Sequence, residues 1–150
     1  MAQPVLLIIA HENYQPVEYQ EPKRVLEENG YTVVTASDQS GTATAKDGST
    51  TEVDTTLEEV DPSEYAGIFF IGGPGAMDYI DGELAYYIAQ RAQALRIPHG
   101  AICIATRILA AAGVLEEKQA TGWNGDGMLP SIFAAYDVDY QEDKDVVVDG

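Results

Sequence analysis

The sequence contains a single cysteine, Cys103, which excludes an internal disulfide and any metal site built from several cysteines. Basic residues are scarce, with 8 Lys and Arg against 25 Asp and Glu and a formal net charge of −17, which argues against nucleic acid or an anionic membrane as a partner. No apolar run is long enough to span a bilayer, and no basic region precedes an apolar stretch as in a secretory signal. We therefore expect a cytoplasmic protein, and 150 residues suit one domain.

The acidic residues are scattered along the chain and not gathered in one block. A solvated acidic coat of this kind is typical of proteins from a salt-rich cytoplasm, but self-repulsion that keeps a protein in solution produces the same composition. Both interpretations are open from the sequence. The first predicts that stability rises with salt, because added ions screen the repulsion between carboxylates.

Short apolar runs alternate with helical patterns along most of the chain. The runs at 5–10, 31–36, 66–71 and 98–102 are typical of strands buried in a parallel sheet. Helices are predicted from Pro16 to just before Gly30, at 82–95, and at 104–112 with Gly113 as the terminating residue, although Pro22 argues against an unbroken first helix. This alternation predicts a doubly wound α/β sheet with helices on both sides.

Two further segments lie outside that alternation. Residues 41–53 are polar and contain Asp47 followed by Gly48, which predicts a small β-hairpin. After the last predicted helix, the sequence indicates a glycine-rich turn at 122–127, a short helical stretch near 132–135 and a strand at 146–148.

Cys103 falls where a strand should pass directly into a helix. Small neighbours at Gly100, Ala101 and Ala105 permit a tight turn that would expose the sulfur, as in the nucleophile elbows of hydrolases. The N-terminus of the following helix would then stabilise a thiolate and lower the pKa of the thiol. A buried structural cysteine is the competing interpretation, and local context does not separate the two.

The Gly-Gly-Pro-Gly segment at 72–75 follows another predicted strand. Its backbone N–H groups are unobstructed by side chains and suit an oxyanion or a phosphate, although a plain glycine-rich turn has the same sequence. In a parallel sheet, this loop and Cys103 belong to the same carboxyl edge. Neither a dinucleotide fingerprint nor a Walker motif is present.

The two histidines and two nearby glutamates are weaker candidates. His11 ends the first strand and is able to point toward the carboxyl edge, whereas His99 begins a strand and reads as a structural residue. Two histidines so placed do not predict a metal site. Glu12 and Glu18 flank the start of the first helix and are within reach of the same edge, although exposed helix glutamates are usually solvated.

These features together resemble the ThiJ/PfpI superfamily, which includes the Parkinsonism-associated protein deglycase and the PfpI-type intracellular proteins. The matching segments are Pro-Val-Glu at 16–18, Ile-Gly-Gly-Pro-Gly at 71–75 and Ala-Ile-Cys-Ile-Ala at 101–105, continued at 108–115, 118–121 and 145–150. The resemblance covers essentially the whole chain.

The resemblance implies a flavodoxin-like α/β/α sandwich that forms a homodimer or a higher homo-oligomer and uses no cofactor. It implies that Cys103 is the reactive nucleophile, that Glu18 hydrogen-bonds its sulfur, and that the backbone N–H groups of Gly73 and Ile104 form an oxyanion hole. From the family pattern, the remaining pocket candidates are His11, Tyr14, Trp123 and Asn124, with the two aromatic residues narrowing the pocket.

The sequence departs from its relatives at two points. Protease-like relatives place a histidine directly after the nucleophile or on a nearby loop, whereas here Ile104 follows Cys103 and the loop reads Gly-Trp-Asn at 122–124. A Cys-His-acid triad is therefore unsupported, and we do not expect peptidase activity. Relatives also continue beyond Gly150 through another strand and a closing helix, so the chain is either naturally short or a fragment.

Three functions are consistent with the sequence. The first is a cysteine-dependent enzyme with hydratase, glyoxalase-like or deglycase-like activity on a small electrophile, in which Cys103 attacks and Glu18 moves the proton. The second is a non-catalytic redox sensor or stress protein whose Cys103 is oxidised to sulfenic or sulfinic acid. The third is a binding or assembly module with an inert cysteine.

Overall fold

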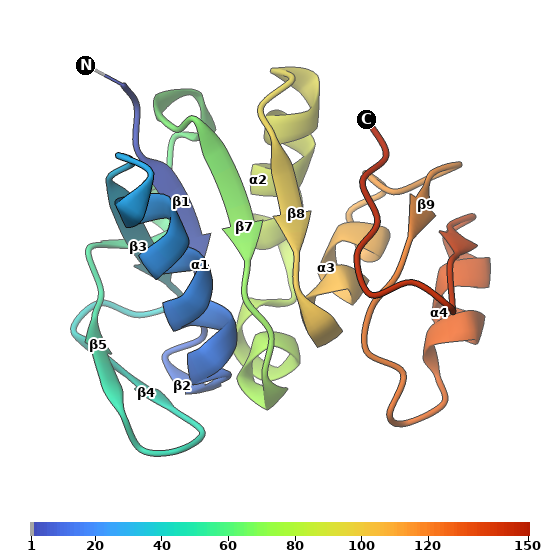
Figure 1. Ribbon diagram of the computed structural model, residues 1–150, viewed down its shortest axis with the longest axis horizontal. Coiled ribbons are helices and arrows are strands. Elements are labelled where there is room, and N and C mark those ends of the chain that lie inside the picture. Colours follow the sequence, from blue (N-terminus) through green and yellow to red (C-terminus); the bar gives the residue numbers. More distant parts are fainter. Residues whose placement is uncertain (1) are drawn as a thin grey trace.

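A five-stranded parallel sheet forms the centre of the computed structural model, which describes residues 2–150. The strands lie in the order β6-β3-β1-β7-β8, and all four pairings between neighbours are parallel (Figure 1). Their bounds are β1 (Val5–Ile8), β3 (Val33–Ser37), β6 (Thr55–Thr56), β7 (Gly67–Phe70) and β8 (His99–Ala101). The four buried runs predicted from the sequence are therefore four of these strands.

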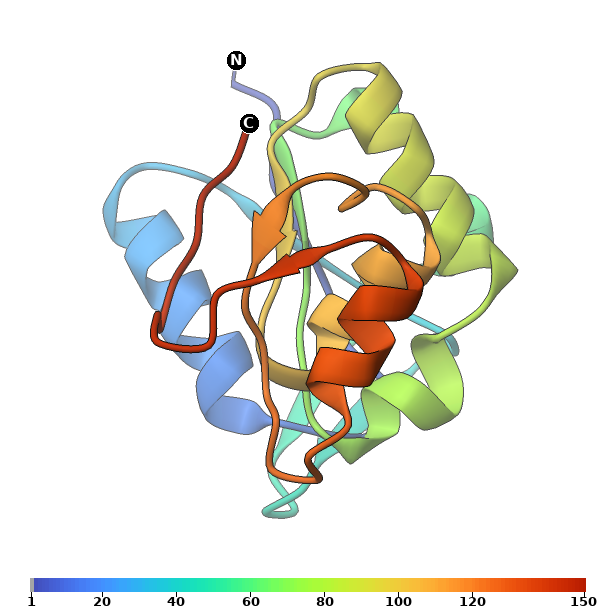
Figure 2. The same ribbon diagram turned by 90° about the vertical axis from the view of Figure 1, so that its right-hand side faces the viewer.

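Both faces of the sheet are covered by helices, which confirms the predicted three layers (Figure 2). Successive side chains of a strand point to opposite faces, so Val5, Leu7 and Ile9 pack on the side of α1 (Pro16–Glu28). Leu6 and Ile8 pack on the other side, with the buried residues of α2 (Glu83–Ala94) and α3 (Thr106–Ala111). This is why the first apolar run is continuous and does not alternate with polar residues.

Helix α1 runs through Pro22 without ending there. Pro22 has no N–H to donate to the carbonyl group of Glu18, four residues earlier. The helix nevertheless persists, because Tyr19 anchors it in the core, where its hydroxyl group and that of Thr35 are hydrogen-bonded at 2.7 Å.

The predicted hairpin is present and consists of β4 (Thr42–Ala45) and β5 (Thr50–Glu52), paired antiparallel. Gly48 supplies the left-handed turn conformation at φ +87°, and the Ser49 N–H donates to the Asp47 carboxylate at 2.9 Å. A short strand after β1, β2 (Glu12–Tyr14), pairs with β4 and joins the hairpin to the carboxyl edge of the main sheet.

The last third of the chain forms a small layer beside α3. Helix α4 (Leu129–Ala135) packs with the two-stranded parallel sheet of β9 (Gln119–Ala120) and β10 (Asp139–Tyr140). Their shared apolar cluster consists of Ala110, Ala120, Leu129, Phe133 and Val138. The strand predicted at 146–148 is wrong: in the described part of the chain this segment joins no sheet, and Val146 and Val148 are 77% and 88% exposed. Three consecutive valines favour an extended backbone, but a strand also needs a neighbour with which to pair.

Short helical turns complete the described chain. They are η1 (Leu57–Glu59), η2 (Pro62–Glu64), the π-helix η3 (Ala76–Ile80) and η4 (Cys103–Ala105). Between residues 2 and 150, none of the helices has the length and apolar character that crossing a membrane would require.

Candidate active site

Three segments that are far apart in the sequence meet at the carboxyl edge of the sheet, the lower edge in Figure 1. The loop at 72–75 follows β7, the Cys103 turn follows β8, and the first turn of α1 carries Glu18. Parallel strands all end at the same edge, so the sheet itself brings these segments together.

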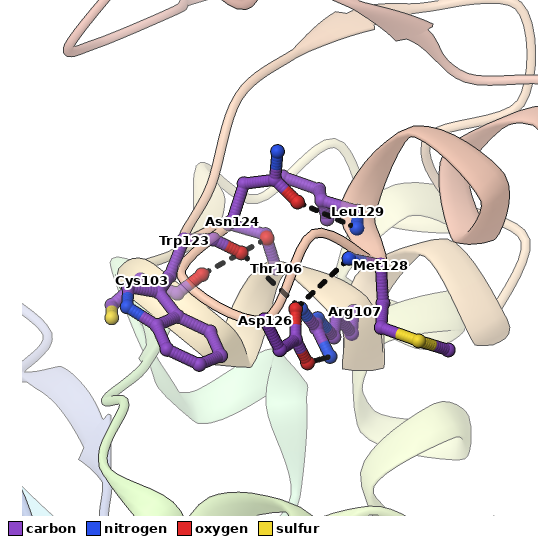
Figure 3. A network of polar contacts seen from close by, with 8 residues as sticks. All are labelled: Cys103, Thr106, Arg107, Trp123, Asn124, Asp126, Met128 and Leu129. Atoms are coloured by element: carbon purple, nitrogen blue, oxygen red, sulfur yellow. Dashed lines mark hydrogen bonds and ion pairs between the residues drawn. The ribbon is translucent and has the colours of Figure 1, made fainter.

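Cys103 lies on a strained turn between β8 and α3. Its φ of +60° is left-handed, a conformation that a residue with a side chain adopts only when its surroundings hold it there. Two donors converge on its carbonyl oxygen, the Thr106 hydroxyl at 3.1 Å and the Trp123 backbone N–H at 3.2 Å (Figure 3). The half-buried thiol therefore lies on a turn whose backbone carbonyl is held by two hydrogen bonds.

Glu18 reaches the same point from α1. Its Oε1 accepts a hydrogen bond from the Gly72 N–H at 3.0 Å, and its carboxyl group lies near enough to the Cys103 thiol for each group to affect the pKa of the other. Gly72 is the residue over which the two side chains meet: a Cβ there would overlap Glu18 Oε1 and lie 3.0 Å from the Cys103 Cβ. A residue with any side chain at position 72 would separate the acid from the thiol.

Burial raises the pKa of both acids. For Glu18, loss of solvent outweighs the lowering effect of the Gly72 N–H and the Cys103 contact, so its pKa rises above 4.5. For Cys103, loss of solvent and the charge of Glu18 raise the thiol pKa above 9.0, although the Ile104 N–H and Arg107 lower it. The sequence-based expectation of a lowered thiol pKa is therefore wrong. Helix α3, which the sequence predicts would stabilise the thiolate, has only six residues. Loss of solvent is the largest effect on the pKa of the thiol.

The two proposed oxyanion donors lie on either side of this pair. Ile104 is the residue after Cys103, and its N–H lowers the pKa of the thiol. Gly73 follows Gly72 at φ +105°, and a Cβ there would lie 2.5 Å from the Gln15 nitrogen and 2.6 Å from the Asn13 oxygen. Only glycine therefore allows the loop to approach the start of α1 this closely.

The remaining histidine and tyrosine candidates are engaged elsewhere. His11 Nδ1 lies 2.6 Å from Asp38 Oδ2, and its ring packs edge-on against Tyr79. His99 is at the start of β8, the end opposite Cys103, and its Nδ1 contacts the Ile97 carbonyl at 2.7 Å. Tyr14 is fully buried, with its hydroxyl group 2.8 Å from that of Thr51, so it belongs to the core and not to an open pocket.

Trp123 and Asn124 belong to the loop that covers the Cys103 turn. Trp123 is 41% exposed, whereas the Asn124 carboxamide oxygen accepts the Leu129 N–H at 2.9 Å and thereby fixes the start of α4. The sequence interpretation missed Arg107 and Asp126, whose ion pair at 2.7 Å joins α3 to this loop. The sequence signal that could have indicated this pair is an arginine within a mostly apolar helix. Across residues 2–150, no three His, Cys, Asp or Glu side chains are grouped so as to hold a metal ion.

Comparison with known proteins gives one consistent family. A sequence model of the DJ-1/PfpI family matches residues 3–150. A deglycase from Pyrococcus abyssi is 34% identical over 147 residues, which cover 97% of this chain and 85% of that protein. The crystal structure of a ThiJ/PfpI domain protein from Brachyspira murdochii superposes with a TM-score of 0.91 at 28% identity, covering 98% of this chain and 83% of that one.

The fold is shared more widely than the sequence. The structure of Drosophila melanogaster DJ-1beta has a TM-score of 0.87 at 24% identity and covers 100% of this chain and 79% of that one. The three layers, the turn that carries Cys103 and the match along residues 3–150 lead to one conclusion: the chain belongs to the DJ-1/PfpI family.

Proposed function

We propose that this protein is a cysteine-dependent enzyme that adds its thiol to a small electrophilic carbonyl compound. The observation that carries the proposal is the meeting of Glu18, Gly72 and Cys103, where a carboxyl group hydrogen-bonded to the Gly72 N–H lies beside a thiol on a strained backbone turn. Deglycase is the name of the Pyrococcus abyssi relative, and hydratase, glyoxalase-like and deglycase-like reactions are the candidate chemistries.

The first step forms a bond between Cys103 Sγ and the carbonyl carbon. The substrate oxygen receives the electron pair of the broken C=O π bond and the proton of Glu18, and Glu18 takes up the thiol proton in its place. In this proposal the Gly73 and Ile104 N–H groups stabilise the charge on the oxygen until it is protonated. The product is a hemithioacetal, and no oxidant or second reactant is consumed.

The raised pKa values suit this addition. A Glu18 that keeps its proton above the usual range of a carboxylic acid is able to donate it to the developing alkoxide. The thiol of Cys103 loses its proton only as the substrate arrives, and Glu18 takes up that proton while it donates its own to the substrate oxygen, so Glu18 is protonated before and after the step. Neither histidine has a polar contact with Cys103 among the described residues, and a peptidase triad is not part of the proposal.

Turnover of small aldehydes and α-dicarbonyl compounds by the purified protein tests this function. Cys103→Ser should abolish turnover, and Glu18→Gln should lower kcat by about 10²- to 10⁴-fold, the usual effect of losing a positioned acid or base. The matched control is Glu21→Gln, an exposed glutamate one turn further along α1. Turnover that survives Cys103→Ser would contradict the proposal.

A redox sensor remains the second candidate, because Cys103 is half-buried and still accessible. Its raised pKa argues against this role, since the thiolate is the form that peroxide oxidises. Mass spectrometry after mild peroxide treatment separates the two candidates. Stoichiometric sulfinic acid at Cys103, in a protein that turns over none of the compounds above, would favour the sensor.

The proposal includes a homodimer or higher homo-oligomer and a cytoplasmic location. Exposed apolar side chains on α2, Leu84 and Tyr87, are 45% and 55% exposed and would suit a contact between copies. Sedimentation velocity should then give a mass at least twice the 16.2 kDa of one chain.

A further inference from the structure

Arg107 is a buried cation that the proposed reaction does not use. It lies in the first turn of α3, is 8% exposed and makes a bidentate pair with Asp126, from Nη2 to Oδ1 at 2.7 Å and from Nη1 to Oδ2 at 3.0 Å (Figure 3). The same Nη2 also donates to the Trp123 carbonyl at 3.3 Å. Arg107 and the Met128 N–H lower the pKa of Asp126 to about 2, so the pair stays charged at any pH of interest.

Fold stability alone does not explain an arginine at this position. Its Nε is the one buried side-chain nitrogen or oxygen between residues 2 and 150 without a hydrogen-bond partner. An unpaired buried donor destabilises the folded state, and a well-packed apolar residue often replaces a buried ion pair without loss. What an apolar residue would not supply is a fixed attachment for the loop that carries Asp126 and Trp123.

Trp123 is held at both its backbone and its ring. Its N–H donates to the Cys103 carbonyl at 3.2 Å, and the Arg107 Cζ lies 5.5 Å from the ring centroid. The indole also folds against Gly125, where a Cβ would lie 2.5 to 2.7 Å from three ring atoms. The ring is nonetheless 41% exposed, and Figure 3 shows it on the same side of the loop as the Cys103 sulfur.

We infer that Arg107 is a positioning residue that fixes Trp123 as one wall of the Cys103 site, and that this wall selects neutral electrophiles with a flat π face. An indole face stacks on planar unsaturated groups. The charge of Arg107 is already neutralised by Asp126, so it offers no site for an anion, and the net charge of −17 repels one. The inference rests on the proposed function, because it assigns a substrate class to the same site.

The test uses alkylation of the single cysteine and does not depend on turnover. Rates are measured at one pH for N-phenylmaleimide and N-ethylmaleimide, and their ratio is divided by the same ratio for free cysteine. In the wild-type protein this normalised ratio should exceed one, and iodoacetamide should react faster than iodoacetate by more than it does with free cysteine. In Trp123→Ala the maleimide ratio should fall about two- to tenfold, the range expected for one aromatic contact.

Two variants displace the ring without removing it. Arg107→Met removes the attachment, and Gly125→Ala places a methyl group against the indole while leaving the Arg107–Asp126 pair intact. Both should lower the maleimide ratio toward that of Trp123→Ala, and both should shift the fluorescence of the only tryptophan. The matched control is Arg24→Met, which breaks exposed ion pairs with Glu21 and Glu28 on α1 and should leave ratio and emission unchanged.

The outcomes separate this inference from the proposed function. A reactive Cys103 whose maleimide ratio is the same in wild type and in Trp123→Ala would overturn the inference alone. A Cys103 that reacts with no probe until the chain unfolds would overturn the proposed function, and the inference with it. If Arg107→Met fails to fold, Gly125→Ala and Trp123→Ala still decide the result.

Discussion

Glu18 and Cys103 form a pair of acids whose protons depend on each other. Each is partly held away from solvent, and the charge of Glu18 raises the pKa of Cys103, whereas the contact with Cys103 lowers the pKa of Glu18. Changing one residue should therefore change the pKa of the other. The two residues come from different elements, α1 and the turn after β8, and their contact depends on the small size of Gly72 between them.

Glu18→Gln should move the midpoint of Cys103 alkylation to lower pH. The substitution removes the carboxylate charge that raises the thiol pKa, and the new carboxamide is able to donate to the thiolate. The measurement is the rate of iodoacetamide labelling against pH, which needs no deconvolution because Cys103 is the only cysteine. A midpoint that stays the same would show that Glu18 does not act on the thiol, and one that rises would show that Glu18 lowers the thiol pKa instead.

The pH dependence of stability should also change in Glu18→Gln. Below about pH 4.5 the carboxyl group is protonated in both the folded and the unfolded chain, so it adds no pH dependence. At higher pH the unfolded chain releases the proton while the folded chain holds it, and the free energy of unfolding falls as pH rises through the folded pKa. The variant lacks this loss, so the free energy of unfolding of Glu18→Gln relative to wild type should rise between pH 4 and 8 in urea titrations.

At the scale of elements, the turn at Cys103 is fixed by segments from outside α3. The loop at 121–128 donates to its carbonyl through Trp123, and Asn124 attaches the same loop to α4. Helix α4 in turn is anchored by Phe133, which is fully buried and packs edge-on against Tyr140 with ring centroids 5.6 Å apart. The small layer of α4, β9 and β10 therefore supports the active-site turn from behind.

Phe133→Ala should lower the free energy of unfolding by about 3 to 5 kcal/mol, the usual cost of removing a buried aromatic ring. Urea denaturation followed by circular dichroism measures this loss. Tyr136→Ala, at the exposed end of the same helix, is the control and should cost much less. Equal effects of the two substitutions would mean that α4 is not packed as a core element.

At the scale of the whole molecule, acidic charge is the dominant feature. Basic residues on α1 pair with their own neighbours, Lys23 with Glu27 and Arg24 with Glu21 and Glu28, and most carboxylates have no basic partner to meet. The folded chain concentrates this charge on a small surface. Repulsion between carboxylates is therefore stronger in the folded state than in the unfolded state, and it lowers the free energy of unfolding.

Stability should therefore rise when sodium chloride is increased from about 0.1 M to about 1 M, since the Debye length falls from about 10 Å to about 3 Å. The melting temperature measured by the fluorescence of Trp123 reports the change. Sodium sulfate at equal ionic strength serves as a comparison, because sulfate also strengthens apolar burial. A melting temperature that is flat or falls in chloride would contradict repulsion as the cause.

The sequence by itself determined the alternation of strands and helices, the hairpin at 41–53 and the position of Cys103 after a strand. These features depend on apolar periodicity and on Gly or Pro at particular positions, which are local properties. The ends of β1, β3, β7 and β8 fall within a few residues of the predicted runs for that reason. Where the residue pattern also resembled a family, it named Glu18 and Gly73 as partners of Cys103 before any geometry was known.

Only the tertiary structure decided the burial, the pKa values and the contacts of those residues. The pKa of Cys103 rises because burial and Glu18 outweigh a short helix, and burial is a property of the packed molecule. Val146 and Val148 form no strand in the described chain because pairing requires a neighbour that valine propensity does not provide. The contacts of Arg107 with Asp126 and Trp123 join two separate segments, α3 and the loop that follows it. They form only when the chain has packed, because the loop must also bond to the Cys103 carbonyl through the Trp123 N–H.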